Sequence, residues 1–179
     1  MPTVARPHRP STGQPGIGRS RVIGPSGWLA TVAFLALMVM SLFWLGQHYQ
    51  LGLNASHSLP HRLYLIERDR PPARGDLVAF RWAGGGPYPE GTTFIKQVSG
   101  IGGDTVQHLG STVLVNGVPI GQMKPRGRNG QVLLPGPTGT VPAGHWFVST
   151  PHPDSLDSRY ALTGWVSPTQ LIGRARVLF

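Results

Sequence analysis

Residues 27–45 read GWLATVAFLALMVMSLFWL, an apolar run without a charged side chain. At about 1.5 Å of rise per residue, a helix of this length nearly spans the ~30 Å hydrocarbon core of a bilayer. Trp28 and Trp44 lie close to its two ends, and indole rings favour the membrane–water interface. The run therefore predicts a single transmembrane helix, to which the rest of the chain is attached.

Two other interpretations of the run are less consistent with its composition. A helix buried in a soluble core normally has a polar stripe, and this run offers only Thr31 and Ser41. A cleaved secretory signal has a shorter apolar core followed at once by small residues, whereas the nearest candidate, Ala55, lies well beyond the run. A retained membrane anchor is the favoured interpretation.

The residues before the run predict how the anchor is oriented. They contain four arginines and no acid: Arg6, Arg9, Arg19 and Arg21. Because basic flanks stay on the cytoplasmic side, we expect a cytoplasmic N-terminus. The sequence then divides into a disordered basic cytoplasmic tail (1–26), a transmembrane anchor (27–46) and an extracytoplasmic domain (47–179).

Composition excludes several classes of function. The chain of 179 residues has 16 Lys and Arg against 7 Asp and Glu, and part of this excess lies in the tail. No nucleic-acid-binding motif is present, so we expect the bilayer, and not nucleic acid, as a partner. The chain has no cysteine, which excludes disulfides and a cysteine nucleophile. Its 7 histidines lack metal-ligand spacing, so neither a metal nor a cofactor is expected.

Beyond the anchor, short apolar runs alternate with Gly- and Pro-rich turns, a pattern typical of antiparallel β structure. No segment has the periodicity of a three-turn amphipathic helix, so we predict a mostly β domain. Asn116-Gly117 between two apolar runs indicates a two-residue hairpin, and residues 83–87 and 124–130 are predicted loops. Six segments are predicted strands: 62–66, 76–80, 93–98, 112–115, 145–148 and 174–178.

Ser58 and Lys96 are a candidate catalytic pair. A serine hydroxyl becomes a nucleophile when a neighbouring base removes its proton. A lysine is such a base only when neutral, and burial among apolar groups lowers its pKa from about 10.4. On a strand, Phe94 and Val98 flank Lys96 on one face and could supply that burial. A serine–histidine pair with His57 or His61 is less consistent, since no acid is obvious that would orient either ring.

Several blocks, in order along the chain, resemble those of the type I signal peptidase family, which uses a Ser/Lys dyad. The similarity is greatest to the TraF-type branch of conjugative transfer. The blocks cover most of the domain, and the acidic one at 154–160 is the most specific. They lie at residues 54–60 with 63–64, 75–78, 94–98 with 102–104, 115–117, 141–148, 154–160 and 171–173.

The resemblance implies a role for each candidate residue. Ser58 would be the nucleophile and Lys96 its general base. The hydroxyl of Ser56 would join the Ser58 backbone N–H in an oxyanion hole. Ser155 would orient the amine of Lys96, and Asp157 and Arg159 would form a supporting ion pair.

The sequence thus predicts a serine endopeptidase, with a signal-peptidase-like β domain on one transmembrane helix of the bacterial inner membrane and its catalytic domain on the periplasmic face. The expected substrate is a membrane-inserted precursor, either a conjugative pilin or another transfer protein. One alternative is a general secretory signal peptidase that removes Ala-x-Ala signal peptides. Another is a non-catalytic membrane-anchored scaffold of a transfer or secretion assembly. Hydrolysis and ring closure of the substrate both remain open.

Overall fold

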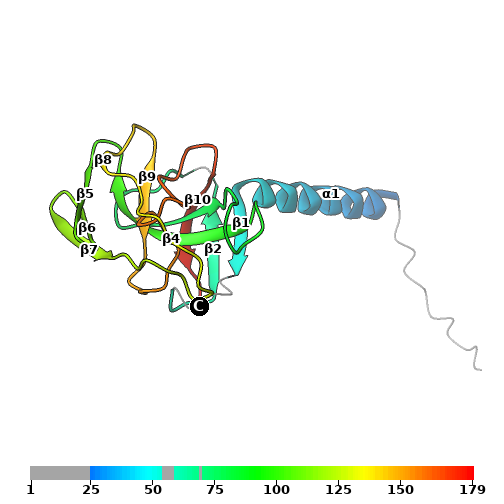
Figure 1. Ribbon diagram of the computed structural model, residues 1–179. Coiled ribbons are helices and arrows are strands. Elements are labelled where there is room, and N and C mark those ends of the chain that lie inside the picture. The colour runs from blue at the N-terminus through cyan, green and yellow to red at the C-terminus, as the bar shows by residue number, and fades with distance from the viewer. Residues whose placement is uncertain (1–24, 54–58, 69) are drawn as a thin grey trace, which may run out of the picture. The chain divides into compact units, whose positions relative to one another are not determined.

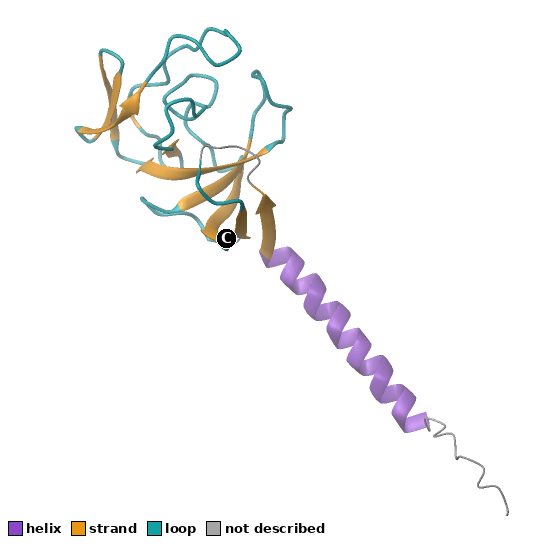
Figure 2. Cartoon of the chain, turned by 90° about the horizontal axis from the view of Figure 1, so that it is seen from below, coloured by secondary structure: helices purple, strands orange, loops and turns teal. Residues whose placement is uncertain are grey.

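A computed structural model describes residues 25–53, 59–68 and 70–179. Its one helix within these ranges is α1 (Pro25–His48), which Figures 1 and 2 show as an uninterrupted rod. Proline is favoured at a helix start because its missing N–H has no partner there anyway. The helix contains the predicted anchor segment, and residues Gly27–His48 are long and apolar enough to cross a membrane.

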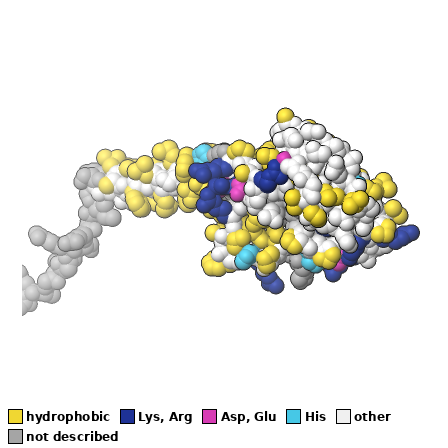
Figure 3. Space-filling model, turned by 90° about the vertical axis from the view of Figure 1, so that its left-hand side faces the viewer, with side chains coloured by type: hydrophobic (Ala, Val, Ile, Leu, Met, Phe, Trp, Pro, Cys, Tyr) yellow, Lys and Arg dark blue, Asp and Glu magenta, His cyan; other side chains and the backbone are white. Residues whose placement is uncertain are grey.

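The surface of α1 is apolar around its circumference. Figure 3 shows hydrophobic side chains along the visible face, and large apolar side chains such as Leu29, Phe34 and Phe43 are exposed. A helix that is hydrophobic on all sides is stable only where lipid or protein surrounds it. This agrees with the predicted membrane span.

The larger sheet has six antiparallel strands in the order β1-β2-β10-β3-β4-β9. The chain enters it directly from the helix, and the last strand, β10, inserts between β2 and β3. The strands are β1 (Tyr49–Leu53), β2 (Leu63–Glu67), β3 (Leu77–Arg81), β4 (Thr93–Ile101), β9 (Trp146–Ser149) and β10 (Leu171–Val177).

The smaller sheet has four antiparallel strands in the order β7-β6-β5-β8. Its strands are β5 (Thr105–Leu109), β6 (Thr112–Val115), β7 (Val118–Gln122) and β8 (Gly139–Thr140). The predicted hairpin joins β6 to β7, with φ of 50° at Asn116 and 78° at Gly117. Positive φ at both central residues is what a two-residue hairpin turn requires, so this prediction is confirmed.

The predicted fold class is confirmed, since the described chain is mostly antiparallel β with one apolar helix. All six predicted strands are present within a few residues of their expected bounds. The pattern missed β1, β5, β7 and β8. β1 continues from the helix without a turn signal, β7 contains Pro119, and β8 has only two residues. Such strands are defined by their pairing partners more than by their own sequence.

The side chains of the larger sheet form a hydrophobic cluster on each face. One contains Val78, Phe80, Val98, Trp146, Val148 and Val166, with Phe94 packed against it. The other contains Tyr64, Ile66, Ala79, Ile95 and Ala175. Because neighbouring side chains on a strand point to opposite faces, Lys96 projects toward the same side as Phe94 and Val98.

Asp104 joins the two sheets at the β4–β5 connection. Its buried carboxylate accepts hydrogen bonds from the Ile101 amide (2.6 Å), the Asn116 side chain (2.8 Å) and the Arg74 guanidinium (2.5 Å). Burial raises the pKa of Asp104, but these three donors lower it more, so that the net pKa falls below its ordinary value. The carboxylate therefore stays ionised and fixes the β6–β7 hairpin to the larger sheet.

We predict that Gly173→Ala destabilises the domain by about 3 kcal/mol, the upper end of the usual cost of overpacking. A Cβ at this position in β10 would lie 2.1 Å from the Glu67 carbonyl oxygen. The strand would have to move away from β2. Urea unfolding of the detergent-solubilised protein, followed by tryptophan fluorescence, measures the loss.

Gly46→Ala is the matched control, because nothing lies within 4 Å of a Cβ there and Gly46 is helical. Its stability should equal or slightly exceed that of the wild type. Equal stabilities for Gly173→Ala and Gly46→Ala would contradict this account of the β2–β10 contact.

Candidate active site

Lys96 lies in the middle of β4, between β3 and β9. Its backbone pairs with Val78 of β3, and its side chain is only 6% exposed. The amine nitrogen Nζ lies 5.6 Å from the centre of the Phe94 ring, in agreement with the expected apolar flank. A lysine amine at this depth has lost most of its hydration.

The electrostatic surroundings of Lys96 lower the pKa of its amine to about 8. Burial is the largest cause, because it penalises the charged ammonium form. Asp157 opposes this shift and Arg159 adds to it. At pH 7 about a tenth of such amines are neutral, compared with about one in 3,000 at an ordinary lysine.

Ser155 contacts this amine directly. Its hydroxyl Oγ lies 2.8 Å from Lys96 Nζ, and both side chains are buried. A hydroxyl both donates and accepts hydrogen bonds, so that it can hold the nitrogen in either protonation state. The two residues are 59 positions apart, and only the fold brings them together.

Asp157 and Arg159 form a buried bidentate ion pair. Arg159 Nε donates to Asp157 Oδ1 at 2.8 Å and Nη2 donates to Oδ2 at 2.9 Å. The side chains are 0% and 2% exposed. A desolvated pair of this kind is stable only when its remaining donors and acceptors are also paired.

Backbone groups complete the pairing. Asp157 accepts from the amides of Thr150 (3.3 Å) and Arg159 (3.2 Å). Arg159 donates to the carbonyls of Gln122 (3.0 Å) and His152 (3.1 Å). The pair thereby fixes the segment that carries Ser155 to the ends of β7 and β9.

Ser56 and Ser58 lie outside the described residues, as does His57. The chain on both sides of them is described: Leu53 of β1 pairs with Leu63 of β2, so residues 54–62 connect adjacent antiparallel strands. Leu59, next to Ser58, packs against the cluster that contains Ile95. The segment before and after Ser58 is thus attached to the sheet that carries Lys96.

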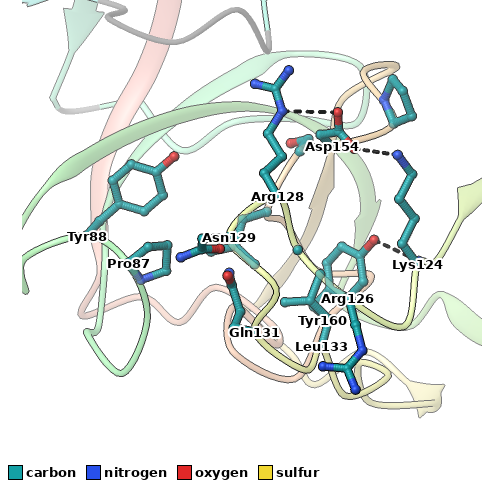
Figure 4. A pocket seen from close by; sticks show the side chains of 14 residues that line it. Pro87, Tyr88, Lys124, Arg126, Arg128, Asn129, Gln131, Leu133, Asp154 and Tyr160 are labelled. Atoms are coloured by element: carbon teal, nitrogen blue, oxygen red, sulfur yellow. Dashed lines mark hydrogen bonds and ion pairs between the residues drawn. The ribbon is translucent and has the colours of Figure 1, made fainter.

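A hollow of about 240 Å³ opens beside Ser155 (Figure 4). We call it the basic hollow, since its walls carry Lys124, Arg126 and Arg128 and a single acid, Asp154. Sequence reasoning assigned residues 124–130 only to a loop. The three cations in the five residues KPRGR were the signal that could have indicated a charged surface.

Within the described part of the chain, no group of three His, Asp or Glu side chains is placed to hold a metal ion. The chemistry that these residues offer is instead that of a buried amine with a supporting ion pair. A neutral amine can remove a proton from a hydroxyl, and the ammonium that forms can return it.

The family model of signal peptidase, peptidase S26, matches residues 26–179, and the chain belongs to this family. A relative described as "Probable conjugal transfer protein TraF" from Sinorhizobium fredii (strain NBRC 101917 / NGR234) is 33% identical over 150 residues. The match covers 74% of this chain and 78% of the relative. The predicted resemblance to the signal peptidases, and to their TraF-type members, is confirmed.

Among solved structures, a signal peptidase I from Enterococcus faecalis V583 is 27% identical. The match covers 62% of this chain and 98% of that chain, with a TM-score of 0.40. The family assignment makes this protein a peptidase, a hydrolase that associates with membranes and acts on a preprotein.

We predict that Asp157→Ala lowers the free energy of unfolding by about 3–5 kcal/mol, because it leaves the Arg159 charge buried without its partner. Urea unfolding measures this loss. The double variant Asp157→Leu/Arg159→Met removes both charges and should recover much of the stability. A double variant as unstable as Asp157→Ala would contradict a role for charge desolvation.

We predict that Lys96→Met stabilises the protein at pH 7 by up to about 3 kcal/mol, the equivalent of lowering a lysine pKa from 10.5 to about 8. Between those two pH values the unfolded wild type binds more protons than the folded one, so wild-type stability rises with pH. Lys96→Met lacks this dependence. The difference between the two proteins should therefore be largest below pH 8 and shrink toward pH 10.5.

Urea unfolding of both proteins at pH 6, 7, 8, 9 and 10 measures this difference directly. The other titrating groups are common to the two proteins, so their contributions to the pH dependence cancel in the difference. A constant difference across the series would show that the amine is not desolvated in the folded protein.

Proposed function

We propose that this protein is a membrane-anchored serine endopeptidase in which Ser58 is the nucleophile and Lys96 the general base. The observation that carries the proposal is the buried Lys96 amine, whose pKa is about 8 and which contacts Ser155. Membership of the signal peptidase family supports it.

In the proposed reaction the neutral amine of Lys96 takes the proton of the Ser58 hydroxyl as its oxygen attacks the scissile carbonyl. The Ser56 hydroxyl and the Ser58 backbone N–H would stabilise the oxyanion, and losing one such donor costs about 2.7–4 kcal/mol in the barrier. The Lys96 ammonium then gives its proton to the leaving amine. An acyl-enzyme remains, which water or another amine resolves.

The supporting residues have separate tasks in this proposal. Ser155 keeps the Lys96 nitrogen directed toward the nucleophile, and the Asp157–Arg159 pair holds Ser155 in place. Asp157 also limits how far burial lowers the pKa of the amine, while Arg159 acts in the opposite direction. The base is therefore weak enough to be partly neutral near pH 7 but still strong enough to accept a proton.

The proposed setting is the bacterial inner membrane. Residues 1–26 would form the cytoplasmic tail, 27–46 the anchor and 47–179 the periplasmic peptidase domain. The apolar helix Gly27–His48 supports the anchor, and the basic residues before it favour this orientation.

The substrate that we propose is a conjugative pilin precursor or another transfer protein. The relative named as a probable conjugal transfer protein supports this choice over general secretion. The family's description as signal peptidases favours, as a second candidate, the removal of Ala-x-Ala signal peptides.

We predict that wild-type protein in detergent cuts a pilin precursor encoded beside it, and that Ser58→Ala and Lys96→Met do not. Mass spectrometry of the products, with a secretory Ala-x-Ala precursor tested in parallel, measures cleavage and its position. A product lighter by one water than the cut linear chain would show ring closure. Ser111→Ala, an exposed serine in the β5–β6 turn, is the matched control and should cut normally.

Each outcome decides between candidates. Cleavage confined to the pilin supports the conjugative substrate, whereas efficient cleavage of the secretory precursor supports the second candidate. Full activity of Ser58→Ala would falsify the proposed nucleophile. If wild type cut neither precursor and no serine-directed acylating probe labelled it, the non-catalytic scaffold would be supported.

A further inference from the structure

We propose that the basic hollow binds a carboxylate of the substrate close to the bond that is cut. This inference rests on the proposed function and extends it to substrate choice. The position and charge of the residues that line the hollow support it.

The hollow adjoins the proposed catalytic amine. Ser155 belongs to its lining and also lies 2.8 Å from Lys96 Nζ. One wall of the hollow is therefore formed by the residue that contacts the proposed catalytic base. The neighbouring residues Asp154 and Leu156 line it as well.

The charge of the lining favours an anion. Its ionisable side chains, apart from Tyr88 and Tyr160, are three cations and one acid, a net charge of +2. Lys124 pairs with one oxygen of Asp154, and Arg128 Nε lies 3.3 Å from the other. The Arg128 side chain is 74% exposed. A guanidinium fork matches the geometry of a carboxylate.

The loop that carries Lys124, Arg126 and Arg128 is held by hydrogen bonds to the rest of the domain. The Lys124 amide donates to the buried Tyr160 hydroxyl at 3.0 Å, and the Leu133 amide donates to the Pro125 carbonyl at 3.0 Å. Asp154 lies between Lys124 and Arg128 and pairs with both, as Figure 4 shows. Charges fixed in advance lose less entropy when they bind a ligand than charges on a mobile loop.

A hollow of about 240 Å³ is smaller than a typical small-molecule site but has room for a side chain and part of its backbone.

Two sources could present the carboxylate. One is an aspartate or glutamate within a few residues of the cut. The other is the free C-terminus of a short segment that is released. Both share the chemistry that Lys124 and Arg128 recognise, and the test below separates them.

The first experiment measures kcat/KM for a precursor that the wild type cuts, with each acid near the cut replaced by its amide. When the replaced acid is the one that the hollow binds, the kcat/KM of the wild type should fall about five- to tenfold. This is the effect of one or two partly exposed ion pairs. Arg128→Gln and Lys124→Gln/Arg128→Gln should show the same fall in kcat/KM on the original substrate. On the amide version their kcat/KM should fall little further. Arg128→Glu should prefer a substrate with lysine at that position.

Arg176→Gln is the matched control, because Arg176 is likewise an exposed arginine, at 56%, that contacts an acid through Nε, here Glu67 at 3.1 Å. It should respond to the substrate changes as the wild type does. If every acid-to-amide change lowers the kcat/KM of Arg128→Gln as much as that of the wild type, the inference is wrong. The proposed function still holds in that case as long as cleavage depends on Ser58.

The second experiment measures binding without catalysis. Ser58→Ala protein is titrated with three fluorescein-labelled alanine decapeptides: one with a central glutamate, one with a central glutamine, and the glutamine peptide with a free C-terminal carboxylate in place of an amide. Tighter binding of the first peptide identifies a side-chain carboxylate, and tighter binding of the third identifies a terminal one. Arg128→Gln should abolish either preference, and high salt should weaken it.

Equal binding of all three peptides, or a preference that survives Arg128→Gln, would overturn the inference. Because this measurement does not depend on cleavage, its failure can be told apart from a failure of the proposed function.

Discussion

The Asp157–Arg159 ion pair is the interaction on which the rest of the candidate site depends. Both side chains are almost completely buried, so their charges are stable only because further hydrogen-bond partners surround the pair. Those partners are backbone groups at the ends of β7 and β9 and in the loop that carries Ser155. One pair of charges therefore fixes the position of the loop and, through Ser155, the direction of the Lys96 amine. A neutral pair of similar volume could fill the space but would not hold three backbone segments at once.

Burial of Lys96 lowers the stability of the fold and makes its amine easier to deprotonate. A lysine in the middle of a central strand costs free energy while it is charged, and an apolar residue there would pack with Phe94 and Val98 without that cost. The same desolvation makes the amine partly neutral near pH 7, which an exposed lysine is not. Locally unfavourable groups of this kind are characteristic of catalytic sites. In this protein the Lys96 amine contacts the Ser155 hydroxyl. The charges of Asp157 and Arg159 shift its pKa in opposite directions.

The candidate site and the basic hollow are built by the same segment. Residues 154–160 contribute Asp154 to the hollow, Ser155 to the amine, and Asp157 and Arg159 to the ion pair. The Tyr160 hydroxyl accepts a hydrogen bond from the Lys124 amide and so holds the start of the loop that carries Lys124, Arg126 and Arg128. The tasks are separated by burial, since Ser155, Asp157 and Arg159 are buried while Asp154 is exposed. The candidate site and the charged surface beside it therefore depend on the same few backbone positions.

The sequence by itself determined the apolar helix, the mostly β class, six of the strands and the Asn116-Gly117 hairpin, because each depends on local composition or on alternation within a few residues. It also identified Lys96, Ser155, Asp157 and Arg159 as candidates through their blocks. Only the tertiary structure decided that Ser155 contacts Lys96 across 59 positions and that Asp157 and Arg159 are buried. It alone decided that β10 inserts between β2 and β3, and that Lys124 and Arg128 stand beside the site. Contacts of this kind depend on strand order, burial and register, which no local pattern encodes.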